Sequence, residues 1–155
     1  MEKLVIDRKA ADNKYLHKDF HLSTDLSLDY VAEHFGEKGV KEYLSTYSTA
    51  YYIPLVAKIK KDGLTALKEY FLAIYEIEEA SDAISASLAG NRLEIVTTYS
   101  PAVMHMLKRE HKPSKWYIET TRTVYGTIAR NAGLDFSLEA YDAKTGAATF
   151  HFIKK

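Results

Sequence analysis

Two stretches of alternating polarity constrain the fold of this 155-residue chain more than any other feature. The segment ISASLAGNRLEIVTT alternates apolar and polar residues around Gly90-Asn91, and DFSLEAYDAKTGAATFHFI does so around residues 142–146. Alternation with period two indicates strands that bury one face, and tight turns join such strands as antiparallel hairpins. The apolar residues that we expect to share a face of the second hairpin are Phe136, Leu138, Ala140, Ala148, Phe150 and Phe152.

The rest of the sequence has the period of α-helices. Apolar residues three and four positions apart predict helices over residues 13–35, 37–52, 64–80, 101–110 and 115–132. Gly36 ends the first helix as a C′ glycine, Pro54 predicts a kink or a new helical turn, and a charged connection follows over residues 56–62. The order of elements predicts an α+β fold, with N-terminal helices before a hairpin, a helix and a second hairpin. The hairpins would form a roughly four-stranded antiparallel sheet with helices packed on one face.

Size and composition favour one domain over residues 1–155, because a chain with 46% apolar residues can bury a core without disulfides or metal ions. Its helical part covers about residues 9–80 and its α+β part about residues 81–155. Basic and acidic residues are balanced at 21 each, so no strong field favours nucleic acid or a membrane surface. The absence of cysteine excludes disulfides and thiolate sites, and no segment has the apolar length of a signal peptide or membrane helix. We therefore expect a cytoplasmic protein that binds no nucleic acid, membrane or cofactor.

His17 and His21 are separated by one helical turn and lie at the edge of the apolar stripe of the first helix. They face the protein interior, away from the polar face that carries Lys18, Asp25 and Asp29. Histidines at this spacing form two half-buried structural contacts, a site for a small ligand, or part of a metal site. A catalytic zinc site needs a third protein ligand, and no carboxylate completes one here, so we predict no metal.

Glu119 and Arg122 are three residues apart on the predicted helix over residues 115–132. One interpretation is a surface ion pair. The other is that Arg122 holds a substrate carboxylate while Glu119 acts as acid or base, or orients Arg122. His105 follows the second predicted strand, where it either looks into a cavity between sheet and helices or has a structural role.

The chain is rich in tyrosine, with twelve in 155 residues. Tyr43, Tyr47 and Tyr51 align on one helical face, as expected of core residues, of a homodimer interface or of a pocket wall for a flat organic ligand. Tyr47, Tyr51 and Tyr117 are our candidates for contacts with a substrate.

Three segments, HKDFH, YSPAVMHM and YIETTRTVYGTIARNAGLDFSLEAYDAKTG, resemble the small bacterial proteins of the L-2-amino-thiazoline-4-carboxylic acid hydrolase-like family over roughly residues 17–152. The segment from LEIVTTYSPA onward also resembles the 4-vinyl-reductase type of small-molecule-binding domain, which has a ligand-sensor fold. Members of the hydrolase-like family often have a cysteine before the proline of the PA motif, where this chain has Ser100. A thiolate mechanism is therefore not implied here.

The resemblance implies hydrolysis of a non-peptide C–N bond in a small heterocyclic or carboxylate substrate, bound as an anion. The residues to which it assigns this chemistry are His17, His21, His105, Glu119 and Arg122. The competing hypothesis is a non-catalytic ligand sensor or dimerisation module of the 4-vinyl-reductase type.

Overall fold

The computed structural model describes residues 18–155, and the elements named here belong to that part of the chain. The helices are α1 (Phe20–Tyr51), α2 (Ile53–Asp62), α3 (Leu64–Ile77), α4 (Pro101–Lys108) and α5 (Glu119–Ala132). The strands are β1 (Ile84–Ala89), β2 (Arg92–Thr97), β3 (Leu134–Tyr141) and β4 (Ala148–Lys154), and a short 3-10 helix over Ser81–Ala83 precedes β1. This arrangement confirms the predicted order of helices and hairpins.

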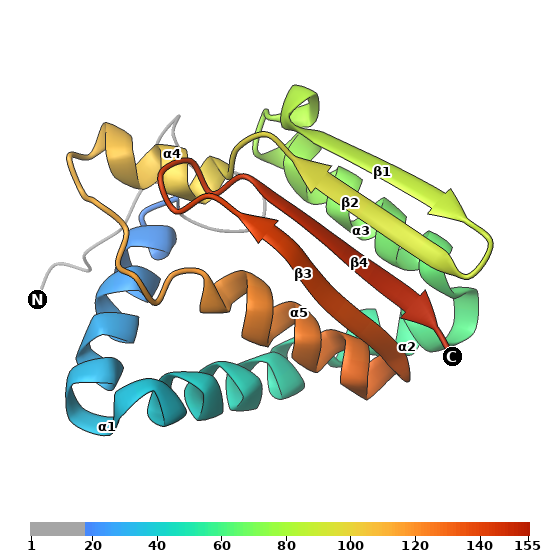
Figure 1. Cartoon of the computed structure of the whole chain (residues 1–155), viewed down its shortest axis with the longest axis horizontal. Helices are drawn as coiled ribbons and strands as arrows, with labels where there is room; N and C mark the ends of the chain where they lie inside the picture. Colours follow the sequence, from blue (N-terminus) through green and yellow to red (C-terminus); the bar gives the residue numbers. More distant parts are fainter. Residues whose placement is uncertain (1–17) are drawn as a thin grey trace, which may run out of the picture.

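The four strands form one antiparallel sheet with the order β1-β2-β4-β3 (Figure 1). Each predicted hairpin is present, and the first turns at Gly90-Asn91, where Ala89 pairs with Arg92. The two hairpins join through β2 and β4, in which Leu93 lies opposite Phe152. The tight turns make each hairpin antiparallel, and β2 and β4 also pair antiparallel, so the whole sheet is antiparallel and the predicted α+β class is confirmed.

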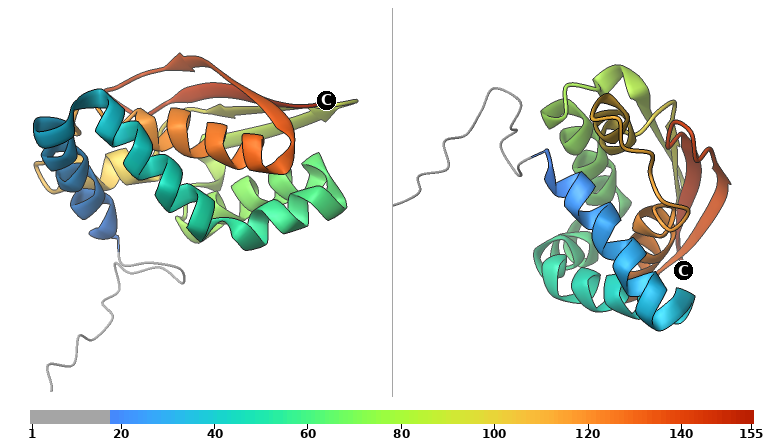
Figure 2. Two further views of the ribbon diagram at one scale, coloured as in Figure 1. Left: turned by 90° about the horizontal axis from the view of Figure 1, so that it is seen from below. Right: turned by 90° about the vertical axis from the view of Figure 1, so that its left-hand side faces the viewer.

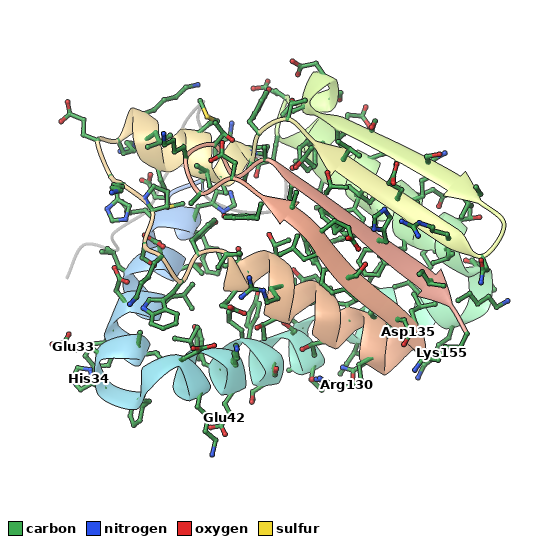
Figure 3. All side chains as sticks on the ribbon, viewed as in Figure 1. Glu33, His34, Glu42, Arg130, Asp135 and Lys155 are labelled. Carbon is green, nitrogen blue, oxygen red and sulfur yellow. The ribbon has the colours of Figure 1, made fainter. Side chains whose placement is uncertain are left out.

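The helices lie in layers on one side of the sheet (Figure 2). Helix α3 packs on β1 and β2, and α5 packs on β3. Helices α1 and α2 pack on this layer, α1 against α5 and α2 against both α3 and α5. Charged side chains such as Glu42, Arg130 and Lys155 lie at the periphery of the molecule (Figure 3). The sheet therefore buries one face against helices, as its alternating sequence predicts.

Aromatic side chains fill the space between the helices and the sheet. The ring of Phe71 in α3 lies 5.0 Å from that of Tyr125 in α5 and 5.5 Å from that of Phe150 in β4. Phe152 completes this cluster at 5.8 Å from Phe71. Aromatic pairs at such separations stabilise a fold by about 0.5–1.5 kcal/mol beyond their buried area. The cluster joins the N-terminal helices to the C-terminal hairpin in one continuous core.

Helix α1 bends sharply at Gly36, whose backbone has φ of 67° and ψ of −170°. This left-handed φ is readily available only to glycine, and it separates the two helical segments that the sequence predicted. The segment before Gly36 reaches α4 through the contact of Asp19 with His105. The segment after Gly36 runs along α5, where the hydroxyls of Ser45 and Thr127 are 3.3 Å apart. The bend therefore lets one long element form two walls of the molecule.

Helix boundaries differ from the prediction in several elements: α3 and α4 end three and two residues early, and the larger differences are in α2 and α5. Helix α2 continues from Pro54 in its first turn to Asp62, so the charged stretch over residues 56–62 is helical and not a connection. Helix α5 begins at Glu119, four residues after the predicted start at Lys115. Residues 115–118 form turns instead, and the backbone N–H of Trp116 donates to the Ser114 hydroxyl. This side-chain acceptor offers the backbone a bond that competes with an earlier helix start.

The second hairpin also differs from simple alternation. A bulge between Leu138 and Ala140 shifts the register, so Tyr141 rather than Ala140 lies opposite Ala148. The expectation that Ala140 shares the inner face was therefore wrong: Ala140 is exposed, and Tyr141 faces the helices. One extra residue in a strand moves every later side chain to the other face.

Candidate ligand-binding site

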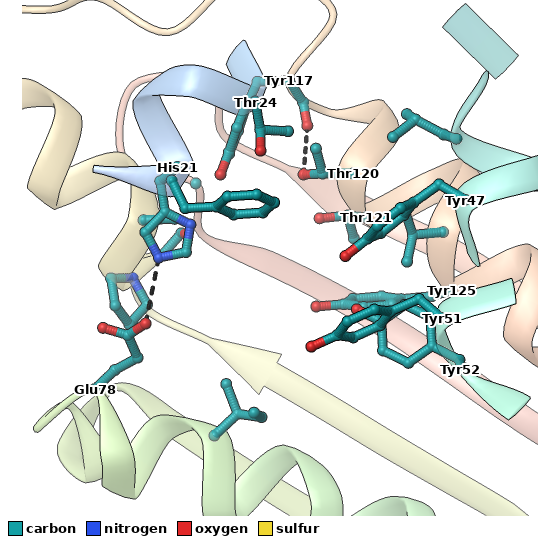
Figure 4. A pocket seen from close by; sticks show the side chains of 18 of the residues that line it. His21, Thr24, Tyr47, Tyr51, Tyr52, Glu78, Tyr117, Thr120, Thr121 and Tyr125 are labelled. Atoms are coloured by element: carbon teal, nitrogen blue, oxygen red, sulfur yellow. Dashed lines mark hydrogen bonds and ion pairs between the residues drawn. The ribbon is translucent and has the colours of Figure 1, made fainter. Parts of the chain in front are cut away.

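A cavity of about 790 Å³ lies among α1, α3, α5 and the start of α4 (Figure 4). Ligand pockets in proteins typically measure about 300–1,000 Å³, so this space suits a small organic molecule. Its walls are mainly helical, and the β3–β4 hairpin contributes Tyr141 and Gly146. Nine of the twelve tyrosines of the chain line it: Tyr43, Tyr47, Tyr51, Tyr52, Tyr70, Tyr75, Tyr117, Tyr125 and Tyr141.

The end of α1 supplies several of these rings because its tyrosines recur at helical spacing. Tyr47 and Tyr51 are stacked, with ring centroids 5.2 Å apart and an interplanar angle of 17°. Tyr52 follows at the end of the helix, and its ring is perpendicular to that of Tyr51, at 81°. Tyr70 of α3 is perpendicular to Tyr52 in turn, at 88°. The rings therefore present π-faces in several directions.

Burial keeps the phenol groups of the cavity neutral. Removal from water raises the pKa of Tyr75 and of Tyr141 to about 12, because it disfavours the phenolate form. It raises the pKa of Tyr117 and Tyr125 well above the usual range for the same reason. At neutral pH each of these hydroxyls can both donate and accept a hydrogen bond.

A histidine and a carboxylate face the tyrosines from the other side of the cavity. His21 Nε2 at the start of α1 is 3.3 Å from Glu78 Oε1 after the end of α3, and the side chains are only 14% and 4% exposed. Figure 4 shows the hydroxyls of Tyr47, Tyr51 and Tyr125 directed toward the side on which His21 and Glu78 lie. The cavity therefore combines aromatic walls with a few polar groups, the usual composition of a small-molecule site.

Four of the eight residues predicted for the site line this cavity: His21, Tyr47, Tyr51 and Tyr117. The inward orientation of His21 agrees with its position at the edge of the apolar stripe. Its predicted partner His17 lies outside the residues that the structure describes.

His105, Glu119 and Arg122 are not among the residues that line the cavity. His105 Nε2 is 3.0 Å from Asp19 Oδ1, which links α4 to the start of α1. Glu119 is 2% exposed and accepts hydrogen bonds from Arg122 Nη1 at 2.8 Å and from the Thr123 hydroxyl at 2.6 Å. Arg122 itself is half exposed. The structure thus places these three residues in contacts with other side chains of the protein, and Glu119 is buried rather than part of a surface ion pair.

Glu78 is the main site residue that the sequence did not indicate. A signal was present, since Tyr70, Ile74 and Glu78 recur every four residues along α3 and line the cavity together. Likewise Thr121, Val124 and Tyr125 of α5 line the cavity, together with Tyr117 from the turn before this helix. On this helix the sequence had indicated Glu119 and Arg122, neither of which lines the cavity.

Within residues 18–155, no three His, Asp or Glu side chains are grouped closely enough to hold a metal ion. The helices of the same region include none with the length and apolar character needed to cross a membrane.

The sequence matches no protein-family model, and no curated protein shows significant similarity to it. The resemblance to the L-2-amino-thiazoline-4-carboxylic acid hydrolase-like family therefore stays a prediction.

Proposed function

We propose that the protein binds a small organic molecule with a flat ring in the tyrosine-lined cavity, as a non-catalytic ligand-binding module. The observation that carries this proposal is the concentration of nine tyrosines around one space of about 790 Å³. A tyrosine offers a rigid apolar face and one polar tip, so it binds planar ligands with little loss of conformational entropy. Binding, unlike catalysis, does not require reactive side chains to be placed together in the cavity.

Hydrolysis is the second candidate, and the contact of His21 with Glu78 inside the cavity favours it. A carboxylate that orients an imidazole can make it a general base for the activation of water. His105 and Glu119, which the hydrolase hypothesis also requires, contact other groups outside the cavity. The geometry therefore supports binding better than it supports this reaction.

The expectation of an anionic ligand depended on Arg122, which does not line the cavity.

The homodimer remains a proposal of its own, because the exposed rings of Tyr43 and Tyr51 at the cavity are also suited to an interface between two copies.

Filling the cavity tests the binding proposal. Thr121 lines it and is partly buried, whereas Thr46 on α1 is exposed and does not. We expect Thr121→Trp to weaken binding of benzyl alcohol by about tenfold or more, since an indole occupies space that the ligand needs. Thr46→Trp is the matched control and should leave affinity unchanged. Isothermal titration calorimetry on the full chain measures both.

Equal affinities in the two variants would show that the ligand does not bind in this cavity.

Chromatography of 2-amino-thiazoline-4-carboxylate after incubation with the protein tests the second candidate, hydrolysis. Conversion of this compound that disappears in His21→Asn would favour hydrolysis. Size-exclusion chromatography of the same samples reports whether the protein is a dimer.

A further inference from the structure

The charges around the cavity indicate which class of ligand it accepts, provided that the proposed binding function is correct. Among the described residues that line it, Glu78 is the single carboxylate, and none is Lys or Arg. Apart from the tyrosines, His21 is the other lining residue whose side chain can carry a charge. The fixed charge of the site is therefore negative or, with a protonated His21, balanced.

Glu78 is poorly hydrated, since its side chain is 4% exposed. An anionic ligand brought next to such a carboxylate loses its own hydration and is repelled by it. A cationic ligand is attracted to it, and the low local dielectric strengthens this attraction. His21 at 3.3 Å is a hydrogen-bond partner for Glu78, and as a neutral imidazole it adds no charge that opposes a cation.

The tyrosine rings favour the same class of ligand. The ring of Tyr52 is perpendicular to that of Tyr51, at 81°, and to that of Tyr70, at 88°, and all three rings line the cavity. The negative faces of such rings attract an ammonium group. The neutral phenol oxygens can also accept hydrogen bonds from its N–H groups.

We propose that the cavity selects a small organic cation, a protonated amine carried on a flat ring, with the amine directed to Glu78 and the ring among the tyrosines. Selection against the corresponding anion follows from the same carboxylate.

Three probes of matched shape test this selectivity: benzylamine, benzyl alcohol and benzoate, which are cationic, neutral and anionic near neutral pH. We expect calorimetry on the full chain to show benzylamine binding at least about tenfold more tightly than benzyl alcohol, with benzoate weakest. Benzoate binding most tightly, or equal affinities for all three, would overturn the cation proposal while leaving the binding function intact. Binding of none of them would contradict both proposals.

A charge-removing variant locates the origin of the selectivity. Glu78→Gln keeps the shape of the side chain. Glu76→Gln is the matched control because Glu76, two residues earlier in the last turn of α3, is exposed and does not line the cavity. We expect Glu78→Gln to weaken benzylamine binding by about tenfold without changing the affinity for benzyl alcohol. Unchanged benzylamine affinity would show that Glu78 does not select the cation. The benzyl alcohol titration verifies that the variant is folded, and the wild-type series tests the selectivity even if it is not.

Discussion

Asp25 shows how one residue can differ from its local pattern. The helical projection placed it on the polar face with Lys18 and Asp29, yet its side chain is completely buried. Its carboxylate is 2.7 Å from His111 Nε2 and accepts the backbone N–H of Ser114. These bonds tie the segment between α4 and α5 to α1.

Removing this carboxylate should destabilise the protein strongly. We expect Asp25→Ala to lower the free energy of unfolding by about 2–4 kcal/mol, because the partly buried donors on His111 and Ser114 lose their acceptor. Asp29→Ala, one turn later on an exposed position, should change it by less than about 0.5 kcal/mol. Urea unfolding followed by circular dichroism measures both. Similar midpoints for the two variants would contradict the structural role of Asp25.

At the scale of elements, the turn between β3 and β4 is held against the start of α4. The Ser100 backbone N–H donates to the Thr145 carbonyl at 2.8 Å, and the Ser100 side chain caps α4. Gly146 has a φ of 70°, and a Cβ atom there would lie 2.5 Å from Ser100 Cβ and 2.8 Å from Val103 Cγ2. The hairpin thus approaches the helix so closely that only glycine fits.

Comparison of Gly146 with Gly133 separates the effect of the steric clash with α4 from the effect of backbone strain. Gly133 also has a positive φ, 78°, but a Cβ atom there would have no neighbour within 4 Å. We expect Gly133→Ala to destabilise the protein by about 1 kcal/mol through strain alone, and Gly146→Ala by a further 1–3 kcal/mol or so through the clash. Chemical denaturation of both variants tests the difference. Equal losses would mean that the hairpin does not contact α4 as described.

At the scale of the whole molecule, burial of tyrosine couples stability to alkaline pH. Tyr75 belongs to α3, Tyr117 to the turn before α5 and Tyr125 to α5 itself, and burial raises the pKa of each. In the unfolded chain their pKa is about 10. Above that pH the unfolded state loses protons that the folded state retains, so the unfolded state is favoured as pH rises.

We therefore expect the contribution of these tyrosines to stability to be constant below about pH 9 and to fall above about pH 10. Each one lowers the free energy of unfolding by about 1.4 kcal/mol per pH unit until its own folded-state pKa is reached. Tyr117→Phe keeps the ring and removes one titrating hydroxyl, so the slope should decrease by that amount. Urea titrations at several alkaline pH values, with tyrosinate absorbance recorded in parallel, measure the slope. An identical slope in Tyr117→Phe would contradict the raised pKa.

Local sequence by itself determined the order of helices and strands, the positions of both hairpins and the bend at Gly36. These features depend on the spacing of apolar residues and on turn residues, which act between near neighbours in the chain. The same spacing correctly aligned Tyr47 with Tyr51 and turned His21 inward. The spacing did not predict the bulge that turns Tyr141 toward the helices, since the register of β3 depends on its pairing with β4.

Tertiary structure alone decided which polar groups meet. His21 and Glu78 are 57 residues apart in sequence, and only the packing of α1 beside the end of α3 brings them to one cavity. In the same way, only the packing of the segment between α4 and α5 against α1 buries Asp25 beneath His111, 86 residues away. The spacing of apolar residues indicates which face of a helix is buried, but it does not indicate which distant segment covers that face. The physical reason is that a buried polar group must find its partner in three dimensions, wherever that partner lies along the chain.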